Sequence, residues 1–532
     1  MIGPVTAAET TAVTALFDHP GPRPVIWSVA GSDSGAGAGI QADIKAGQAF
    51  GVHVCTAVAA ITAQHSRAVT RVQAVDPDLL DAQLAALAGD MPPAAIKTGM
   101  LGSAANVRVL AGWVRRLRQR APVALVVDPV LRATTGAALA DAELQAALRD
   151  ELLPLADVAT PNQREAAILA RAADGTAPPT LAAAWRELGT RAVAVTGGDA
   201  PSPDGLVHDW IDTPLASGGL RLPRVATQHH HGTGCVFATS AAAALALGYP
   251  DADALVWAKM ATVRALQLAY PAGQGAGPVS PQPRFQLDAA LLPGLSLPGQ
   301  AALPDAPFAP LREPELGVYA VVDSADWVAR VLAAGVRTVQ LRIKDPAHPQ
   351  LRQQIAASIR AADEAGAQLF INDHWQIARE LGAYGVHLGQ EDLHTADLPA
   401  LQRAGLRLGL SSHAPWEVCR ALAVRPSYIA CGPIRETDSK AMPWQPQGFG
   451  NLAYWAGLLP LPVVAIGGLD ADGVERAARA GAASAAVIRA LTQAGDLQAA
   501  ADDLHHAWQR GRQAVPAMPP AWPHSTLRQA PR

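Results

Sequence analysis

Apolar residues in the C-terminal part of the chain fall into eight short runs, separated by stretches of helical character. Short apolar runs bounded by Gly, Pro or polar residues are typical of buried parallel strands. The eight predicted strands are residues 316–322, 337–341, 368–371, 384–388, 406–410, 428–431, 463–466 and 485–488. Eight strands alternating with helices predict a closed (β/α)8 barrel, a TIM barrel.

The N-terminal part also alternates predicted strands with helical stretches, in the manner of an open α/β sheet. Its predicted strands are residues 24–30, 52–58, 94–98, 123–127, 157–159, 192–196 and 220–228. The whole chain is therefore of the α/β class, with two differently built halves.

Residues 286–314 are rich in Pro, Ala and Leu and lack a sustained period apart from a turn at 288–292. At 532 residues the chain is also too long for one ordinary domain. We expect a first domain over 23–285, a linker over 286–314 and a barrel domain over 315–512. Apolar residues 291–295 leave a second interpretation open, in which this segment docks on a domain surface.

Polar side chains follow nearly every predicted barrel strand, where the active sites of such barrels form. Arg342, Lys344 and Lys440 are three cations without a neighbouring acidic run, which suits an anion of several charges such as pyrophosphate. Asp373 and Asp392 are hard oxygen ligands at the ends of neighbouring strands, which suits Mg²⁺. Singly, such residues could be a solvated edge or a helix cap. Their shared position at strand ends favours a site.

The last two predicted strands add signs of a phosphate site. The seventh strand ends in Gly467-Gly468 and the eighth in Ile488-Arg489. Barrels commonly bind phosphate at these two positions through backbone N–H groups. The barrel is therefore expected to bind two phosphorylated ligands.

Two glycine-rich turns stand out in the N-terminal part. The first, residues 31–39, follows a predicted strand, but it has neither the dinucleotide fingerprint nor the Gly-Lys-Ser/Thr of a P-loop. The second contains Gly232, Thr233 and Gly234 before an apolar helix over 236–247. Free N–H groups and the dipole at a helix start favour the charge of a transferred phosphoryl group. The second turn is therefore a candidate anion hole.

Cys235 stands at the end of the second turn. The field of the helix start would lower the pKa of its thiol and make the thiolate a proton acceptor. The alternative is that Cys235 is a small buried hydrophobe. His229, His230 and His231 precede the turn, but consecutive residues of a strand point to opposite faces, so we expect no shared metal ion.

Five barrel motifs resemble those of thiamine phosphate synthase and keep that family's order across residues 311–509. They are QLRIK (340–344), FIND (370–373), GVHLGQED (385–392), GLSSH (409–413) and IGG (466–468). The resemblance implies that hydroxymethylpyrimidine diphosphate is joined to thiazole phosphate with release of pyrophosphate.

The same resemblance implies roles for individual residues. The pyrimidine diphosphate would be held by Gln340, Arg342, Lys344, Asn372 and Lys440, Mg²⁺ by Asp373 and Asp392, and the rest of the pocket would be formed by Ser411, Thr437, Ser439, Gly468, Ile488 and Arg489. Arg342 and Lys440 would act catalytically on the departing charge. Two positions depart from the family: Pro-Thr-x-Thr-Lys reads ETDSK over 436–440, and Arg489 replaces a small hydroxyl residue.

Motifs around both glycine-rich turns resemble hydroxymethylpyrimidine/phosphomethylpyrimidine kinase, a ribokinase-like enzyme of three-layer α/β/α fold. They include VAGSDS (29–34), GAGIQADIK (37–45), TAQ (62–64), IKTGML (96–101), VDPV (127–130), TPNQREA (160–166) and HGTGC (231–235). The resemblance places the pyrimidine against Gly31, Asp43, Gln64 and Met100, Mg²⁺ and ATP against Asn162, Glu165, Gly232, Thr233 and Gly234, and Cys235 as the catalytic base.

One position of this half also departs from the family. Lys-Gly-Gly-His reads TGGD over 196–199, so a cation expected near the nucleotide phosphates is missing, and Lys97 or Arg132 could replace it. Two alternatives stay open for this half: a pyridoxal-type vitamin kinase and a non-catalytic pyrimidine-binding module. The leading interpretation is a bifunctional enzyme with Mg²⁺ as cofactor and ATP as co-substrate, whose first half makes the diphosphate that the second consumes.

Composition narrows the expected partners. The formal net charge is −4 and no basic run occurs, so neither nucleic acid nor an anionic membrane is expected to bind. The four cysteines form no C-x-x-C pair, which indicates neither a disulfide framework nor a zinc site and fits a reducing cytoplasm. We expect small-molecule substrates as partners and leave a homo-oligomer open.

Overall fold

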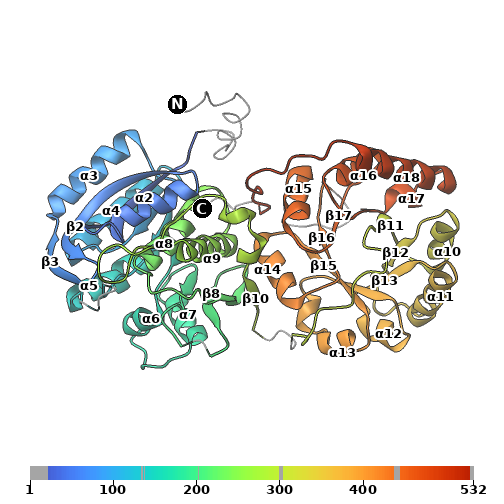
Figure 1. Cartoon of the computed structure of the whole chain (residues 1–532), viewed down its shortest axis with the longest axis horizontal. Coiled ribbons are helices and arrows are strands. Elements are labelled where there is room, and N and C mark those ends of the chain that lie inside the picture. The colour runs from blue at the N-terminus through green and yellow to red at the C-terminus, as the bar shows by residue number, and fades with distance from the viewer. Residues whose placement is uncertain are drawn as a thin grey trace. The chain divides into compact units, whose positions relative to one another are not determined.

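The computed structural model of the chain describes residues 22–133, 136, 138–201, 203–298, 303–436 and 444–527 (Figure 1). It divides into two compact units, with the division between Leu297 and Pro298 along the chain. Each unit alternates strands and helices, as the hydrophobic pattern predicts. In the part of the chain that is described, no helix combines the length and apolar character needed to cross a membrane.

The first unit is a three-layer α/β/α domain built on a 10-stranded sheet with the order β10-β9-β8-β7-β6-β5-β4-β1-β2-β3. Its strands are β1 (Val25–Asp33), β2 (His53–His65), β3 (Ala68–Ala74), β4 (Ala95–Thr98), β5 (Ala124–Val127), β6 (Val158–Ala159), β7 (Val193–Val195), β8 (Leu206–Asp212), β9 (Ser217–Pro223) and β10 (Gly294–Ser296). The six strands from β2 through β1 and β4 to β7 pair in parallel, and β3, β8, β9 and β10 add antiparallel edges.

Helices cover both faces of this sheet. One layer contains α2 (Gly39–Ala49), α8 (Thr233–Ala246) and α9 (Asp251–Gln267). The opposite layer contains α3 (Pro77–Asp90), α4 (Ala104–Arg118), α5 (Ala142–Ala147), α6 (Gln163–Ala170) and α7 (Pro178–Glu187). The carboxyl ends of β1 and β5, and the starts of α2, α6 and α8, carry the residues that the motifs single out.

The prediction misplaced two parts of the first unit. The strand expected over 220–228 ends at Pro223, so His229 to His231 lie in a loop. The predicted linker also begins too early, because β10 pairs with β9 and Leu291 and Leu295 are buried. Docking of this apolar segment, the alternative interpretation, is what the structure shows.

The second unit is a closed barrel of eight parallel strands, and all eight were predicted. They are β11 (Gly317–Val322), β12 (Thr338–Leu341), β13 (Gln368–Asn372), β14 (Gly385–Leu388), β15 (Arg407–Ser412), β16 (Tyr428–Cys431), β17 (Val463–Ile466) and β18 (Ser484–Val487). Its helices are α10 (Ala325–Ala333), α11 (Leu351–Glu364), α12 (Trp375–Glu380), α13 (Leu398–Arg403), α14 (Pro415–Val424), α15 (Gly448–Leu458), α16 (Ala471–Arg479), α17 (Arg489–Thr492) and α18 (Leu497–Gln513).

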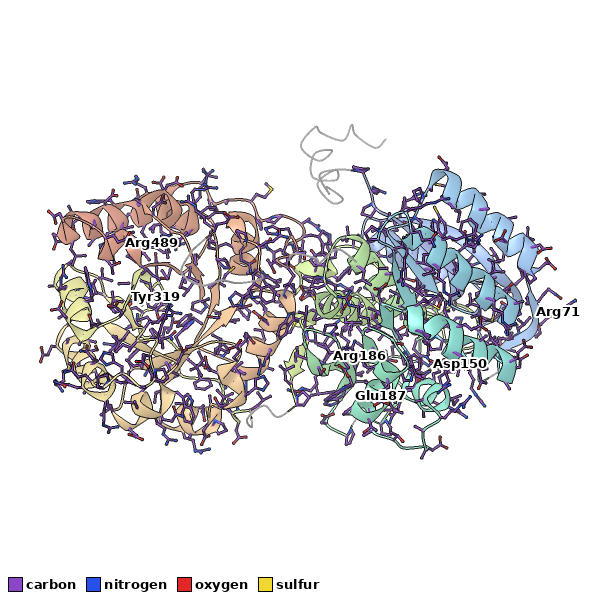
Figure 2. The ribbon with its side chains drawn as sticks, turned by 180° about the vertical axis from the view of Figure 1, so that it is seen from behind. Arg71, Asp150, Arg186, Glu187, Tyr319 and Arg489 are labelled. Carbon is purple, nitrogen blue, oxygen red and sulfur yellow. The ribbon has the colours of Figure 1, made fainter. Side chains whose placement is uncertain are left out.

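Side chains, not open space, fill the barrel. Tyr319, Phe370 and Tyr428 pack with ring centroids 5.1 to 6.3 Å apart (Figure 2 labels Tyr319). Gly409 is required beside them, because a Cβ there would lie 2.1 Å from the Tyr428 ring. Tyr428 therefore reaches from β16 across β15 toward β14.

The chain continues to pack on the barrel beyond the predicted domain end at 512. The Asn451 side chain of α15 accepts from the His524 amide at 2.8 Å and donates to its carbonyl at 2.9 Å. Leu527 forms an isolated antiparallel bridge with Trp444. The barrel unit therefore includes a C-terminal extension held by backbone and side-chain hydrogen bonds.

Candidate active sites

The two glycine-rich turns of the first unit pack against each other. Gly232 has φ +86°, and a Cβ there would lie 2.0 Å from the Gly37 carbonyl oxygen. Gly39 has φ +57°, and its Cβ would lie 2.2 Å from the Gly31 carbonyl oxygen. Only glycine fits such positions without strain. Residues almost 200 positions apart in the sequence thus form one site.

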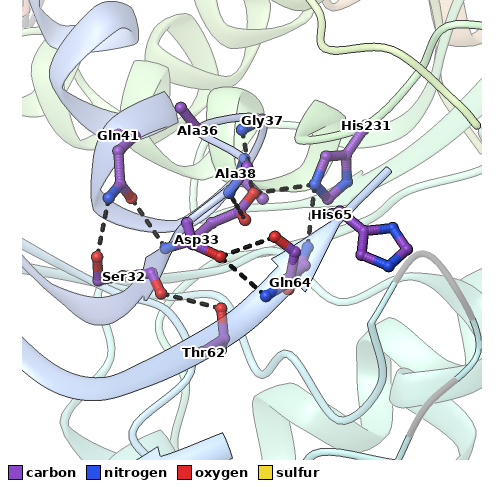
Figure 3. A network of polar contacts seen from close by, with 12 residues as sticks. Ser32, Asp33, Ala36, Gly37, Ala38, Gln41, Thr62, Gln64, His65 and His231 are labelled. Carbon is purple, nitrogen blue, oxygen red and sulfur yellow. Dashed lines mark hydrogen bonds and ion pairs between the residues drawn. The ribbon is translucent and has the colours of Figure 1, made fainter. Parts of the chain in front are cut away.

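Asp33 and His231 link these turns through side chains (Figure 3). The Asp33 carboxylate accepts N–H groups of Gly35, Gly37 and Ala38 at 2.8 to 3.0 Å and lies 3.1 Å from His231 Nε2. Burial raises the pKa of Asp33, but His231 and the backbone donors outweigh it and lower the pKa overall. Gln64 Nε2 is 3.1 Å from the same histidine nitrogen. The predicted substrate residue Gln64 therefore belongs to this network.

Two further residues predicted to contact the pyrimidine adjoin each other. A Cβ on Gly31 would lie 2.5 Å from Met100 Cε. Met100 is 8% exposed, so it forms a wall beside the first turn. The structure thus brings Gly31 and Met100 together, while their contact with a substrate stays a prediction.

Asp43 has a different environment from the one expected. It is fully buried within α2 and accepts from Lys97 Nζ at 2.9 and 3.0 Å. Ser28 Oγ and Thr239 Oγ1 donate to it at 2.6 and 2.7 Å. Its carboxylate is thus saturated by the protein itself. Lys97 is correspondingly engaged with Asp43, which argues against the interpretation that it replaces the missing nucleotide cation.

The expected lowering of the Cys235 pKa is wrong. Burial raises the pKa of its thiol to about 12, although Lys97 and a hydrogen bond from the Gly39 backbone oppose this rise. Asp43 and Asp128 add negative charge nearby, and each raises the pKa further. Desolvation therefore outweighs the field of the helix start, and the thiol is protonated at neutral pH.

Asp128 was missed as an individual site residue, although it directly follows β5 within a quoted motif. Its carboxylate lies beside the second turn, 3.9 Å from where a Gly234 Cβ would be. Burial raises its pKa to about 6, with Lys97 opposing and Asp43 adding to the shift. An aspartate directly after a buried strand was the sequence signal that could have identified it.

Asn162 and Glu165 form a reciprocal cap at the start of α6. Asn162 Oδ1 accepts from the Glu165 amide at 2.9 Å, and the Glu165 carboxylate accepts from the Asn162 and Leu131 amides at 3.1 and 3.0 Å. Burial, followed by the charge of Asp128, raises the pKa of Glu165 to about 7. Asp128 and Glu165 are thus two neighbouring buried acids near the predicted nucleotide site.

The turn that lacks the expected lysine has another cation. Arg224 donates to the carbonyls of Gly198 and Ala200 at 2.9 and 2.8 Å. Beneath it, Asp209 accepts from the Gly197 amide at 2.8 Å and from Lys259 at 2.7 Å. The sequence motif gave no indication of Arg224, because the residue comes from a different segment, after β9.

At the barrel mouth, the structure brings Asp373 and Asp392 together. Asp373 follows β13 with φ +62°, and Asp392 accepts from the Gly389 amide at 2.7 Å. Burial and then the neighbouring Asp392 raise the pKa of Asp373, with Arg342 opposing. In the described ranges no group of three or more His, Cys, Asp or Glu forms a metal cluster. The carboxylate pair fits Mg²⁺ whose other ligands are phosphate oxygens or water.

The other described residues predicted for the barrel site lie at or after the carboxyl ends of its strands. Gln340 and Asn372 are buried at the ends of β12 and β13, Lys344 is exposed, and Ser411 is partly exposed near the end of β15. Gly467 and Gly468 have φ +105° and +69°. Ile488 caps α17, and Arg489 is its exposed first residue (Figure 2). Thr437, Ser439 and Lys440 lie outside the described residues.

Sequence reasoning missed three residues of the barrel interior. His387 Nδ1 lies 2.8 Å from Tyr428 Oη, and His387 Nε2 lies 2.9 Å from Ser411 Oγ. Tyr428 Oη in turn is 2.9 Å from Tyr319 Oη. The inward positions of these side chains on β11, β14 and β16 could have been noticed from the predicted register. Their mutual contacts could not.

An α/β unit with an anion turn, followed by a barrel that combines cations and paired carboxylates, defines a two-part enzyme acting on phosphorylated small molecules. The family model of phosphomethylpyrimidine kinase matches residues 33–280, and that of thiamine monophosphate synthase matches residues 318–491. The chain belongs to the family of bifunctional thiamine biosynthetic enzymes, in which such a kinase precedes a thiamine-phosphate synthase.

Individual relatives agree with this assignment. The thiamine biosynthetic bifunctional enzyme of Arabidopsis thaliana, described as chloroplastic, is 32% identical over 96% of this chain and 98% of its own length. Thiamine-phosphate synthase of Serratia proteamaculans is 53% identical over 37% of this chain and 93% of its own length.

Two solved kinases are similar to the first unit. Bacillus subtilis pyridoxal kinase, solved as an ADP complex, has 30% identity and a TM-score of 0.45, and covers 49% of this chain and 97% of its own. Clostridium difficile phosphomethylpyrimidine kinase has 28% identity and a TM-score of 0.40, and the match covers 46% of this chain and 100% of that kinase. With TM-scores below 0.5, these likenesses do not discriminate between the two vitamin kinases.

Proposed function

We propose that the first unit phosphorylates hydroxymethylpyrimidine and then its monophosphate from Mg²⁺ and ATP, and that the barrel joins the diphosphate to thiazole phosphate. The main support for this proposal is that family models of both enzymes match this one chain, and that a bifunctional relative aligns with 96% of it. The product of the first reaction is the substrate of the second, which gives the fusion a chemical logic.

In the kinase, the bond from the γ-phosphorus to ADP breaks while a bond to the acceptor oxygen forms. That oxygen is the hydroxyl of hydroxymethylpyrimidine in the first transfer and a phosphate oxygen of its monophosphate in the second. The N–H groups of the Gly232–Gly234 turn would stabilise the transferred charge. Asn162, Glu165 and Asp128 would position Mg²⁺ with the nucleotide. Since the Cys235 thiol is protonated, it must release its proton to solvent before it can accept that of the hydroxyl in the first transfer. Lys97 is the neighbouring charge that favours this loss.

In the barrel, the bond from the pyrimidine methylene carbon to the diphosphate oxygen breaks, and the electron pair leaves with pyrophosphate. The thiazole nitrogen then donates its lone pair to the methylene carbon. Neither step needs a proton acceptor, which agrees with a mouth rich in cations. Arg342, Lys344 and Lys440 would stabilise the leaving charge, while Mg²⁺ held by Asp373 and Asp392 would neutralise pyrophosphate. Gln340, Asn372, Ser411, Thr437, Ser439, Gly468, Ile488 and Arg489 would line the pocket.

One experiment tests both halves in the full chain. With ATP, Mg²⁺ and hydroxymethylpyrimidine, ADP should form and the diphosphate should appear; adding thiazole phosphate should convert it to thiamine phosphate and pyrophosphate. Pyridoxal in place of the pyrimidine tests the rival kinase specificity. The proposal for the first unit would be contradicted if ADP formed with pyridoxal but not with hydroxymethylpyrimidine, or if it formed with neither compound. We propose the cytoplasm as the location, although the Arabidopsis relative is described as chloroplastic.

A further inference from the structure

A chain of buried polar groups crosses the interior of the barrel and ends at its mouth. Gln340 Nε2 donates to Tyr319 Oη at 3.3 Å, which lies 2.9 Å from Tyr428 Oη. Tyr428 Oη is 2.8 Å from His387 Nδ1, and His387 Nε2 is 2.9 Å from Ser411 Oγ. The first four side chains are at most 6% exposed, whereas Ser411 is partly exposed. This chain of five residues is called the barrel relay below.

Protonation states fix how many hydrogens the barrel relay contains. His387 is 6% exposed and its Nδ1 and Nε2 lie 2.8 and 2.9 Å from two hydroxyl oxygens, an arrangement that a neutral ring with one N–H and one acceptor nitrogen satisfies. Burial raises the pKa of both Tyr319 and Tyr428, so both phenols keep their protons. Each relay member therefore has a defined number of donors across the physiological pH range.

Donation can run along the barrel relay from Gln340 toward Ser411, since either phenol can be the donor between Tyr319 and Tyr428 and either ring nitrogen of His387 can hold its proton. Because Tyr319 Oη accepts from Gln340, its own hydrogen can go to Tyr428, and that of Tyr428 to His387 Nδ1. The single N–H of His387 is then on Nε2 and points to Ser411. In this arrangement every donor of the relay has one acceptor, which buried polar groups require. The Ser411 hydroxyl accepts inside the protein and keeps its hydrogen for an acceptor at the mouth.

We propose that the barrel relay positions the Ser411 hydroxyl as a hydrogen-bond donor to the departing pyrophosphate, with His387, Tyr428 and Tyr319 as positioning residues. This inference rests on the proposed synthase reaction. A donor held ready for charge that grows as the bond breaks stabilises the transition state more than the bound substrate. Its loss therefore lowers kcat more than it raises KM.

The central variant is Tyr428→Phe, which preserves the ring that packs on Gly409 and Phe370 but removes the relay hydroxyl. His387 can then carry its proton on Nδ1, so Ser411 donates to Nε2 instead of to the ligand. We expect synthase kcat to fall about 10-fold or more, with KM changed less than about threefold and kinase activity of the same sample unchanged. Ser411→Ala should give a similar loss, and the double variant should lose no more than the larger single loss.

Two further variants separate positioning from packing. Tyr384→Phe is the matched control, because Tyr384 Oη donates to Gln368 and accepts from the Arg312 amide at the opposite end of the barrel. This variant should leave synthase kcat unchanged. His387→Gln retains an amide donor near the position of Nε2 and should keep more activity than His387→Leu.

Each outcome has a definite meaning. If the unaltered chain makes no thiamine phosphate from the diphosphate and thiazole phosphate, the proposed function fails. If it does, but Tyr428→Phe retains its kcat, or the losses of Tyr428→Phe and Ser411→Ala multiply in the double variant, the barrel relay does not position Ser411. Equal losses in His387→Gln and His387→Leu would also overturn the inference.

Discussion

Lys97 Nζ lies 2.9 and 3.0 Å from the two carboxylate oxygens of Asp43, and neither side chain has exposed surface. The pair joins β4 to α2, the helix that follows the first glycine-rich turn. Burial alone would lower the pKa of Lys97, but Asp43, Cys235 and Asp128 raise it overall. The charged pair therefore supports the site, and its removal should affect both stability and phosphoryl transfer.

Lys97→Met should leave an uncompensated buried carboxylate and destabilise the first unit by about 3–5 kcal/mol. The double variant Lys97→Met/Asp43→Asn should be less destabilised than Lys97→Met. The measurement is the urea concentration at which half of the first unit becomes susceptible to limited proteolysis, because kinase activity itself changes in these variants. Synthase activity in the same tube is the internal control and should keep its midpoint. A double variant that unfolds at a lower urea concentration than Lys97→Met would contradict the buried-charge explanation.

Alkylation of Cys235 should report its raised pKa. With a pKa of about 12, the thiolate fraction at pH 8 is about ten times that at pH 7, so the rate with iodoacetamide should rise about tenfold per pH unit between pH 7 and 9. Mass spectrometry of the peptide containing Cys235 measures the rate, and Cys235→Ser identifies the adduct. A rate that levels off by pH 8 would show that the helix start lowers the pKa after all.

Cys235→Ala should reduce the kinase rate at least about 10²-fold, the scale of a positioned proton-transfer group, while the synthase rate stays unchanged.

The Mg²⁺ concentration that half-saturates the kinase should fall as pH rises through 6 to 7. Asp128 and Glu165 have pKa values raised to about 6 and about 7, so both are largely protonated below this window and charged above it. Only the charged forms attract the cation. Titrating kinase activity with Mg²⁺ at pH 5.5 to 8 should show a falling half-saturation concentration. Glu165→Gln should flatten this dependence, and an unchanged slope in that variant would remove Glu165 from the site.

Arg224→Ala should raise the KM for ATP severalfold and leave the KM for hydroxymethylpyrimidine unchanged. Arg224 holds the carbonyls of the 196–199 turn region, where the family's lysine is replaced by Thr196, so its loss should loosen the predicted phosphate contact. Arg221→Ala, on neighbouring β9, is the matched control for loss of one positive charge. Equal effects of both variants would indicate only a change of overall charge.

Lys440→Ala should reduce synthase kcat about 10²–10³-fold, the scale of removing a preorganised charge-stabilising donor. This prediction comes from the sequence motif, because Lys440 lies outside the described residues. Kinase activity should continue, so the pyrimidine diphosphate should accumulate when ATP, pyrimidine and thiazole phosphate are supplied together. Chromatography that shows thiamine phosphate forming at the unaltered rate would make Lys440 a surface charge.

Much of the fold could be predicted because its signals are local. All eight barrel strands appear as short apolar runs, since a parallel strand covered on both faces is apolar at nearly every position. The antiparallel strands β3 and β8 were missed, because neither is apolar at every position. Their solvent-facing positions weaken the pattern, as the exposed Arg71 of β3 illustrates (Figure 2).

The sequence by itself determined the two-part organisation, the turns that need glycine and the polar residue types at strand ends, because periodicity and backbone conformation are encoded over a few residues. Only the tertiary structure decided that Asp43 binds Lys97, that the Cys235 thiol stays protonated, that Arg224 holds the 196–199 turn region and that His387 connects Tyr428 to Ser411. These features depend on desolvation and on contacts between residues distant in the chain. Their energies arise from the surroundings of a side chain and not from its neighbours in sequence.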